Sequence, residues 1–304
     1  MYVGDKNHTL LFEQGGSAQV GGVHTRTVRA NADATFDLDE LKTLLRPKDD
    51  LYPKSALICV ENTNCALGGV AVPLEFLEKL QSFARQHHLP VHMDGARLMN
   101  AAVALGVQPR DVTKYVDTVM MCFSKGLGAP IGSALAGPKD FITKARRVRK
   151  ALGGSWRQAG VVAAPALLAL KTAQEKVRRD HKNAAAIRKL FREKGLGLFE
   201  VTENGISTNM VVVGIADCQL QKGQGGLQGA AVSERLKQVT EEELRHVGRR
   251  VEVVAPFPSI IPNKFRLVTH CNVGDEEMAL LMRKLTFVLQ EYQTLYNGTV
   301  DATY

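Results

Sequence analysis

The sequence predicts an α/β protein with a mainly parallel sheet, followed by a smaller α+β domain. The first observation is a pair of apolar runs, Val91 to Asp94 and Val116 to Lys125, each ending in a charged residue before a turn. The second is the helix-patterned segment Ala96 to Leu105 between them. Strand, crossover helix and strand in this order form the βαβ unit of a parallel sheet.

Strand and helix patterns also alternate upstream, which is typical of a doubly wound sheet. Thr9 to Phe12 is strand-like, and Asp37 to Leu45 is a short amphipathic helix stopped by Pro47. Ala56 to Val60 is a buried strand that leads into Glu61, and Leu74 to His88 alternates apolar and charged residues as a helix does.

Downstream of Lys125, Gly153 and Gly154 break a basic helix, and Arg157 opens a long apolar helix that extends through Leu170. Beyond Arg178 the composition shifts to charged helix and polar turns. We therefore expect a large domain over residues 1–178 and a small C-terminal domain over residues 179–304.

The small domain is expected to hold three strands, a surface loop and a final helix. The strands are Thr208 to Val213, Arg250 to Val254 and Phe265 to Thr269. The Gly- and Gln-rich stretch Gln219 to Gly229 is typical of a loop insertion. The amphipathic helix Asp275 to Tyr296 is expected to pack on the strands.

Composition restricts the partners. The 304 residues are 45% hydrophobic and carry a formal charge of +8, enough for a sizeable core in a basic protein. The one dense basic cluster, Lys144 to Lys150, has no interleaved aromatic residues to stack on bases, so it indicates a solvated helix face and no nucleic-acid partner. A positive site would instead favour an anionic cofactor and substrate.

Cysteine and histidine usage indicates a reducing compartment without a metal centre. Five cysteines at irregular spacing form neither a disulfide framework nor a CxxC site. His92 and Asp94 alternate on a strand while His87 and His88 close a helix, so we expect no metal. No apolar run reaches the roughly 18 residues of a membrane span, and no signal-peptide pattern is present. A cytosolic protein without membrane contact is expected.

Asp94 and Lys125 are expected near the carboxyl ends of neighbouring strands, the edge at which open α/β sheets bind ligands. A lysine and a carboxylate placed this way suit pyridoxal 5'-phosphate (PLP), whose aldehyde condenses with the lysine and whose ring nitrogen pairs with the acid. Taken singly, Asp94 is also a good N-cap for the next helix, and Lys125 could be an ordinary solvated residue.

The amino-acid sequences of four short motifs are more specific for a protein family than the spacing of Asp94 and Lys125. They are ENTNCALGGV (61–70), HMDGAR (92–97), SKGLGAPIGS (124–133) and RKALGGSWRQAG (149–160). Together they resemble the L-threonine aldolases, which are PLP-dependent enzymes of fold type I. The resemblance runs from about His8 to the C-terminal helix. It implies a cytosolic homotetramer, a dimer of dimers with shared active sites, that splits L-threonine or L-allo-threonine into glycine and acetaldehyde.

The resemblance also implies roles for individual residues near the cofactor. Lys125 carries PLP, Asp94 faces the pyridinium nitrogen, and Ser124 contacts the phosphate. His8 stacks on the ring and is a candidate for handling the proton of the substrate hydroxyl. Arg97 lies near the phenolic oxygen or the substrate carboxylate, although without the motif a structural ion pair would account for it and a surface position for His8.

Two further arginines are carried over from the family. Arg157 would reach the phosphate of a neighbouring subunit, and Arg266 would pair bidentately with the substrate α-carboxylate. Phe12 and Trp156 depart from the family pattern, which has an aromatic hydroxyl residue and a methionine at these places. The family's Ser-Gly-Thr phosphate turn is not found ahead of His8, so the large domain is expected to be N-terminally incomplete.

The expected reaction is retro-aldol cleavage of the Cα–Cβ bond, with His8 or a water as the base. It belongs to glycine formation and threonine breakdown in amino-acid metabolism. Three alternatives stay open: another PLP-dependent lyase or aminotransferase reaction, a catalytically silent truncated subunit, and, less favoured, a nucleic-acid binder.

Overall fold

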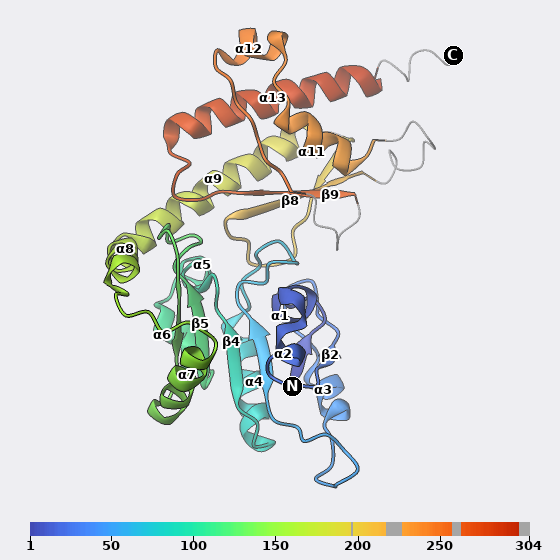
Figure 1. The fold of residues 1–304 in the computed structure, drawn as a ribbon. Helices are drawn as coiled ribbons and strands as arrows, with labels where there is room; N and C mark the ends of the chain where they lie inside the picture. Colours follow the sequence, from blue (N-terminus) through green and yellow to red (C-terminus); the bar gives the residue numbers. More distant parts are fainter. Residues whose placement is uncertain (196, 217–226, 257–262, 298–304) are drawn as a thin grey trace. The chain divides into compact units, whose positions relative to one another are not determined.

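A computed structural model describes residues 1–195, 197–216, 227–256 and 263–297 of the chain (Figure 1). Contacts group the chain into two compact units. Unit 1 comprises Met1–Arg178 and Asn204–Thr208, and unit 2 comprises Arg179–Glu203 and Asn209–Tyr304. The domain boundary after Arg178 stays a prediction. A domain is a part of the chain that could fold alone, whereas these units are defined only by their internal contacts.

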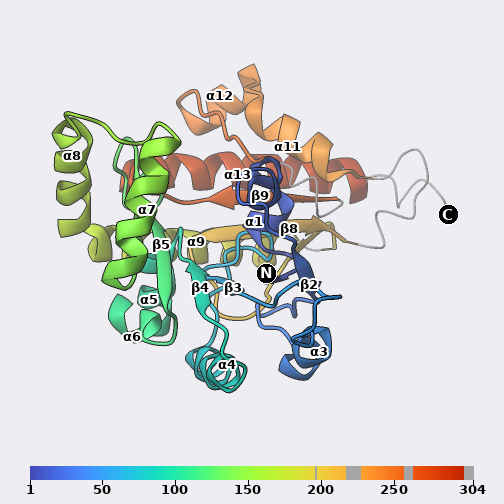
Figure 2. The ribbon, with the colours of Figure 1, turned by 60° about the horizontal axis from the view of Figure 1, so that its bottom comes forward.

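Unit 1 contains a six-stranded sheet in the order β2-β1-β3-β4-β5-β6. Neighbouring strands are parallel except for the antiparallel pair β5 and β6. The order can be followed in Figure 2 from β5 through β4 and β3 to β2. The strands are β1 (Tyr2–Gly4), β2 (Arg26–Val28), β3 (Ile58–Glu61), β4 (Val91–Asp94), β5 (Thr118–Cys122) and β6 (Ser133–Ala136).

The helices of unit 1 follow these strands, as expected for an α/β fold. They are α1 (His8–Leu11), the 3-10 turn η1 (Glu13–Gly15), α2 (Gly16–Gln19), α3 (Leu38–Leu44), α4 (Leu74–Gln86), α5 (Leu98–Leu105), α6 (Pro109–Thr113), α7 (Lys139–Ala151) and α8 (Gly160–Lys171), with α9 (Ala173–Lys194) beginning in this unit. Leu77 and Leu80 of α4 pack with Ile58 of β3 and Val91 of β4 in one core cluster. Because side chains alternate along a strand, Asp94 projects from the face opposite to Val91 and Met93.

Unit 2 contains a three-stranded antiparallel sheet in the order β7-β8-β9. Its elements are β7 (Phe199–Val201), β8 (Met210–Ile215), α11 (Gly229–Lys237), α12 (Glu241–Val247), β9 (Lys264–Val268) and α13 (Asp275–Asn297). Phe265 of β9 packs edge-on against Phe191 and Phe199 in the core of the unit.

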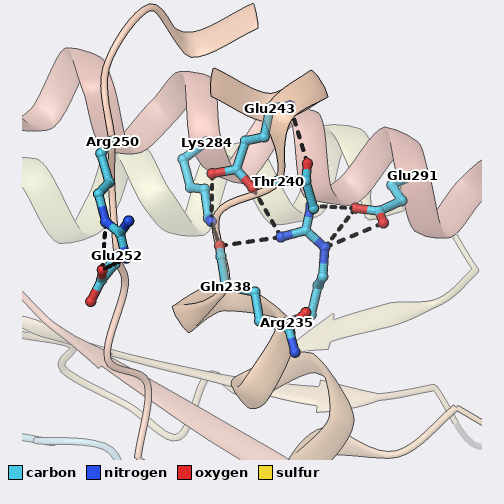
Figure 3. Close-up of polar contacts among 8 residues, drawn as sticks. All are labelled: Arg235, Gln238, Thr240, Glu243, Arg250, Glu252, Lys284 and Glu291. Carbon is cyan, nitrogen blue, oxygen red and sulfur yellow. Dashed lines mark hydrogen bonds and ion pairs between the residues drawn. The ribbon is translucent and has the colours of Figure 1, made fainter. Parts of the chain in front are cut away.

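A buried network of charges joins α11, α12 and α13 (Figure 3). Lys284 Nζ lies 2.6 Å from Glu243 Oε1, and both side chains are almost inaccessible to solvent. Arg235 lies 2.9 Å from Glu243 Oε2 and 2.8 Å from Glu291 Oε2. Each buried charge of the network therefore has an opposite charge in direct contact, as buried charges require.

The main strand and helix predictions of the βαβ unit are confirmed by β4, α5 and β5. Two strand predictions are wrong. Thr9 to Phe12 lies in and just after helix α1, and residues 250–254 form no strand. Smaller corrections are that Arg157 precedes α8, which begins at Gly160, and that Arg97 is the N-cap of α5.

The predicted loop Gln219 to Gly229 lies mostly outside the described residues, and Gly229 itself begins α11. Among the described residues, none of the helices has the length and apolar character needed to cross a membrane.

Candidate active site at the carboxyl edge of the unit 1 sheet

Four neighbouring strands bring polar residues to one edge of the sheet. Since β1, β3, β4 and β5 are parallel neighbours, their carboxyl ends share that edge. His8 follows β1, Glu61 ends β3, Asp94 ends β4, and Lys125 follows β5. This is the edge at which α/β sheets bind ligands. The structure thus gathers four ionisable side chains from segments far apart in the sequence.

Asp94 is buried, with 4% of its surface exposed. Its strand is held in register by the pairing of Glu61 with Asp94 and by a 2.8 Å hydrogen bond from Asn62 N–H to the Asp94 carbonyl oxygen. Ala96 N–H donates to Asp94 Oδ1 at 3.0 Å, the one hydrogen bond to this carboxylate among the described residues. A carboxylate can accept about four, so Asp94 keeps capacity for a ligand donor.

Two glycines allow the backbone to approach closely around this acid and Lys125. A Cβ on Gly95 would lie 2.7 Å from the Met120 carbonyl oxygen, and one on Gly126 would lie 3.1 Å from Asn100 Oδ1. The turn after β4 therefore depends on the absence of a side chain, and the turn after β5 leaves little room for one. This close packing explains why glycine follows both Asp94 and Lys125 in the sequence.

Lys125 is partly buried in the turn after β5, where its carbonyl oxygen accepts a hydrogen bond from Gly128 N–H at 2.9 Å. Its ammonium group has neither a hydrogen bond nor an ion pair with any described residue. The amine is therefore available for reaction, whereas a structural lysine would have a carboxylate or carbonyl partner. Ser124, beside it, is exposed.

His8 begins α1, and its ring is held at one side by Glu13. The His8 Nε2 to Glu13 Oε1 distance is 3.4 Å, and the His8 and Phe12 ring centroids are 4.9 Å apart. His8 N–H donates to Glu61 Oε2 at 2.8 Å. The backbone of His8 is therefore tied to the end of β3, while its ring contacts Glu13 and Phe12.

Glu61 is a member of this group that the sequence analysis did not select. Cys65 N–H donates to its Oε1 at 2.9 Å, and Asn64 Nδ2 donates to its Oε2 at 3.0 Å, in addition to the bond from His8. Burial raises the pKa of Glu61 to about 7, although the hydrogen bonds from Cys65 and His8 favour the charged form. The available sequence signal was an acid at the end of an apolar strand.

The three arginines implied by the family lie in different places. Arg97 is partly buried beside the edge, and its charge lowers the pKa of Glu61, an effect smaller than that of burial. Arg157 is exposed in the segment before α8. Arg266 lies on β9 in unit 2, whereas the other candidates belong to unit 1. Among the described residues, no cluster of histidine, cysteine and acidic side chains could hold a metal ion.

The residues at the edge fit PLP. The donor set combines an unpaired amine, Lys125, with a buried carboxylate, Asp94, that has spare acceptor capacity. Two buried polar atoms, Asn62 Nδ2 and Thr63 Oγ1, also have no hydrogen-bond partner in the described structure. Buried polar atoms normally have partners, so these atoms are suited to meeting a polar ligand at the end of β3.

Solved structures share this fold. A threonine aldolase from Leishmania major superposes with a TM-score of 0.68 at 15% identity, over 95% of this chain and 77% of that one. At this identity the likeness concerns the fold alone. The predicted fold class is therefore confirmed: the chain has the α/β fold of the fold-type I PLP-dependent enzymes, which include threonine aldolases and aminotransferases.

Sequence comparison gives the family. The model of the Beta-eliminating lyase family matches residues 1–216, and the chain belongs to that family. It is 35% identical over 277 residues to the low specificity L-threonine aldolase of Escherichia coli K12, covering 91% of this chain and 73% of the relative. It is 42% identical over 218 residues to low-specificity L-threonine aldolase 1 of Arabidopsis thaliana, covering 71% of this chain and 60% of the relative. The predicted resemblance to the L-threonine aldolases is thus confirmed. The chain spans less than two thirds of the length of several of these curated relatives.

Proposed function

We propose that the chain is a PLP-dependent aldolase that cleaves L-threonine or L-allo-threonine into glycine and acetaldehyde. The observation that carries this proposal is the placement of Lys125, whose amine has no partner among the described residues, and of the buried Asp94 at the carboxyl ends of adjacent parallel strands. The names of the Escherichia coli and Arabidopsis relatives support the choice of substrate.

Within this proposal, bound PLP would supply an electron sink for the pair released when the Cα–Cβ bond breaks. Lys125 would be the point of covalent attachment. Asp94 would hold a proton on the ring nitrogen, because a buried carboxylate favours a cation beside it. Asn62 and Thr63 would donate polar contacts from the end of β3.

The remaining candidate residues would bind and orient the substrate. Arg266 would bind the α-carboxylate with its planar guanidinium, and Arg97 would lie near the phenolic oxygen or that carboxylate. His8 would remove the proton from the substrate hydroxyl, either directly or through a water. Ser124 would contact the cofactor phosphate.

We also propose that the chain works as a homo-oligomer in the cytosol, with Arg157 contributing to a neighbour's phosphate site. An exposed apolar surface on α8 supports an interface. Val161 is 74% exposed, Leu167 63% and Leu168 67%, on a helix whose other face packs through Ala166 and Ala169. Exposed patches of this kind mark protein contacts.

Product analysis tests the reaction. The chain is incubated with PLP and L-threonine, and glycine, acetaldehyde, ammonia and 2-oxobutanoate are measured. Aldol cleavage predicts equal amounts of glycine and acetaldehyde without ammonia. The second candidate, favoured by the family description, is elimination at the β-carbon. It predicts ammonia and 2-oxobutanoate in equal amounts, because water is lost and the imine is hydrolysed. D-threonine is the matched control, and we expect no products from it.

A further inference from the structure

The Glu61 carboxylate joins three backbone segments at the candidate site. It accepts hydrogen bonds from His8 N–H of α1, at 2.8 Å, and from Asn64 Nδ2 and Cys65 N–H of the turn after β3, at 3.0 and 2.9 Å. Asn64 Nδ2 also donates to the Lys6 carbonyl oxygen at 3.2 Å, so the same amide bridges back to the segment before α1. His8 and Glu61 are 53 residues apart in the sequence.

The position of Glu61 links these segments to Asp94. The two acids are direct partners in the register of β3 and β4, and the next residue, Asn62, donates its N–H to the Asp94 carbonyl oxygen. Glu61 is 5% exposed, so a shift of its carboxylate would leave three donors facing a buried gap. A rigid connection therefore runs from the Asp94 strand through Glu61 to His8.

We propose that Glu61 is a positioning residue of the site, whose carboxylate sets the place of His8 and of the 62–65 turn relative to Asp94. The role in catalysis rests on the proposed aldolase function, whereas the link between Glu61 and His8 does not. A displacement of about 1 Å in a catalytic group costs up to roughly a hundredfold in rate, so such a connection matters for a base that must reach one hydroxyl.

The three hydrogen bonds favour an ionised carboxylate, whereas burial opposes it. All three groups that face Glu61 are donors, and a protonated acid or a glutamine would turn a donor of its own toward one of them. The titratable and charged groups around Glu61 are Asp94 on β4, Arg97 before α5, and His8 with its partner Glu13 at α1. Burial and Asp94 favour the proton on Glu61, while Arg97 and the hydrogen bonds oppose it, and the pKa is about 7. The contact with His8 is therefore expected to weaken as the pH falls below neutrality.

Selective ¹⁵N-histidine labelling tests the link without cofactor or substrate. The His8 amide is assigned by its loss in His8→Gln and followed between about pH 5 and 9. Because imidazoles in general change charge in this pH range, the informative quantity is the difference between variants. We expect the pH-dependent change in the His8 amide shift to be clearly smaller in Glu61→Gln than in the wild type, and to equal the wild-type change in Glu78→Gln, an exposed glutamate on α4. A wild-type amide that does not titrate, or one that titrates equally in Glu61→Gln, would overturn the proposal. If Glu61→Gln fails to fold, Glu61→Asp serves instead, with a smaller shift expected for its shorter side chain.

The catalytic part is tested by steady-state kinetics on the PLP-loaded chain. We expect Glu61→Gln to lower kcat by about tenfold or more with little change in KM, and to flatten the acid limb of the kcat pH profile. Glu61→Asp should recover part of the rate and the limb. A purely structural Glu61 would lower the folded fraction and leave the profile of the active fraction unchanged, which would refute the positioning role. Absence of acetaldehyde from the wild type would instead refute the proposed function.

Discussion

The carboxyl edge of the unit 1 sheet and the charge network of unit 2 both bury ionisable groups, but the groups have different partners in the two regions. In unit 2, Glu243 contacts both Lys284 and Arg235, so charge meets charge inside the protein. At the sheet edge, Glu61 is satisfied by neutral N–H donors, and Asp94 accepts a single hydrogen bond among the described residues.

This difference distinguishes a structural network from the proposed binding site. When every charge in a buried set is already paired, no group remains free to bind a ligand. Removing one member leaves its partner buried without an opposite charge. An edge that holds a free amine and an acid with spare acceptor capacity has something to offer to a cofactor. Variants at the sheet edge should therefore lose cofactor binding while keeping their stability. Variants in the unit 2 network should lose unfolding free energy while keeping cofactor binding.

The largest effect is expected from Lys125→Ala. Loss of the attachment point should abolish the visible absorbance of bound PLP and lower threonine cleavage by about a thousandfold or more, with folding preserved. Lys79→Ala, an exposed lysine on α4, is the matched control and should leave both unchanged. A cofactor spectrum that survives Lys125→Ala would place the attachment elsewhere.

Lys284→Met should have the opposite signature. Removing the ammonium leaves the buried Glu243 with Arg235 alone, and breaking a buried pair costs about 3 to 5 kcal/mol of unfolding free energy. The cofactor spectrum of the folded fraction should not change. Lys237→Met is the control, because its pair with Glu234 is exposed and contributes less than about 1 kcal/mol. Urea unfolding measures both, and equal stabilities would show that the network is dispensable.

The pH dependence of stability sharpens the comparison at Glu61. Its pKa is about 7 in the folded chain against an ordinary 4.5, so the folded state retains the proton longer than the unfolded state. The contribution of Glu61 to the free energy of unfolding is fully present below pH 4.5, and it is lost as the pH rises through 7. The loss is about 3 kcal/mol at 1.36 kcal/mol per pKa unit. We expect the unfolding free energy of the wild type to fall by this order relative to that of Glu61→Gln between pH 4.5 and 8, and a constant difference would contradict the shift.

The smallest effect is expected at Arg266. Arg266→Lys keeps the charge but loses the planar pair of donors, so KM for threonine should rise about tenfold while the cofactor spectrum stays the same. An unchanged KM would assign the carboxylate to another residue, with Arg97 the first to test.

The helices and strands that were predicted correctly have a hydrophobic pattern that can be read within a single continuous segment of the sequence. The apolar runs predict β3, β4 and β5, and the amphipathic period predicts α4 and α13, because buried faces need apolar residues at fixed spacing. Strands β1 and β2 have three residues each, too few for a period to show.

The failed predictions depend on distant contacts. Thr9 to Phe12 has strand-like residues, yet the bond from His8 N–H to the Glu61 carboxylate fixes the start of a helix there. The segment 250–254 alternates charged and apolar residues but lacks the ladder of hydrogen bonds that would make it a strand; Val253 N–H donates instead to the carbonyl oxygen of Leu236 on α11. Glu61 was overlooked for the same reason, since its partner His8 lies 53 residues away. The placement of Asp94 and Lys125 at the ends of neighbouring strands was predictable, because each ends an apolar run before glycine.

The central claim is that the sheet edge is a PLP site with Lys125 as its attachment point. Its most direct test is to incubate the chain with PLP, reduce with borohydride, digest with a protease that does not cleave at lysine, and locate the modification by tandem mass spectrometry. The account predicts a phosphopyridoxyl group on the side chain of Lys125, reduced in yield in Asp94→Asn and absent from a sample without PLP. Modification at another lysine, or equal labelling of many exposed lysines with none favoured, would contradict it.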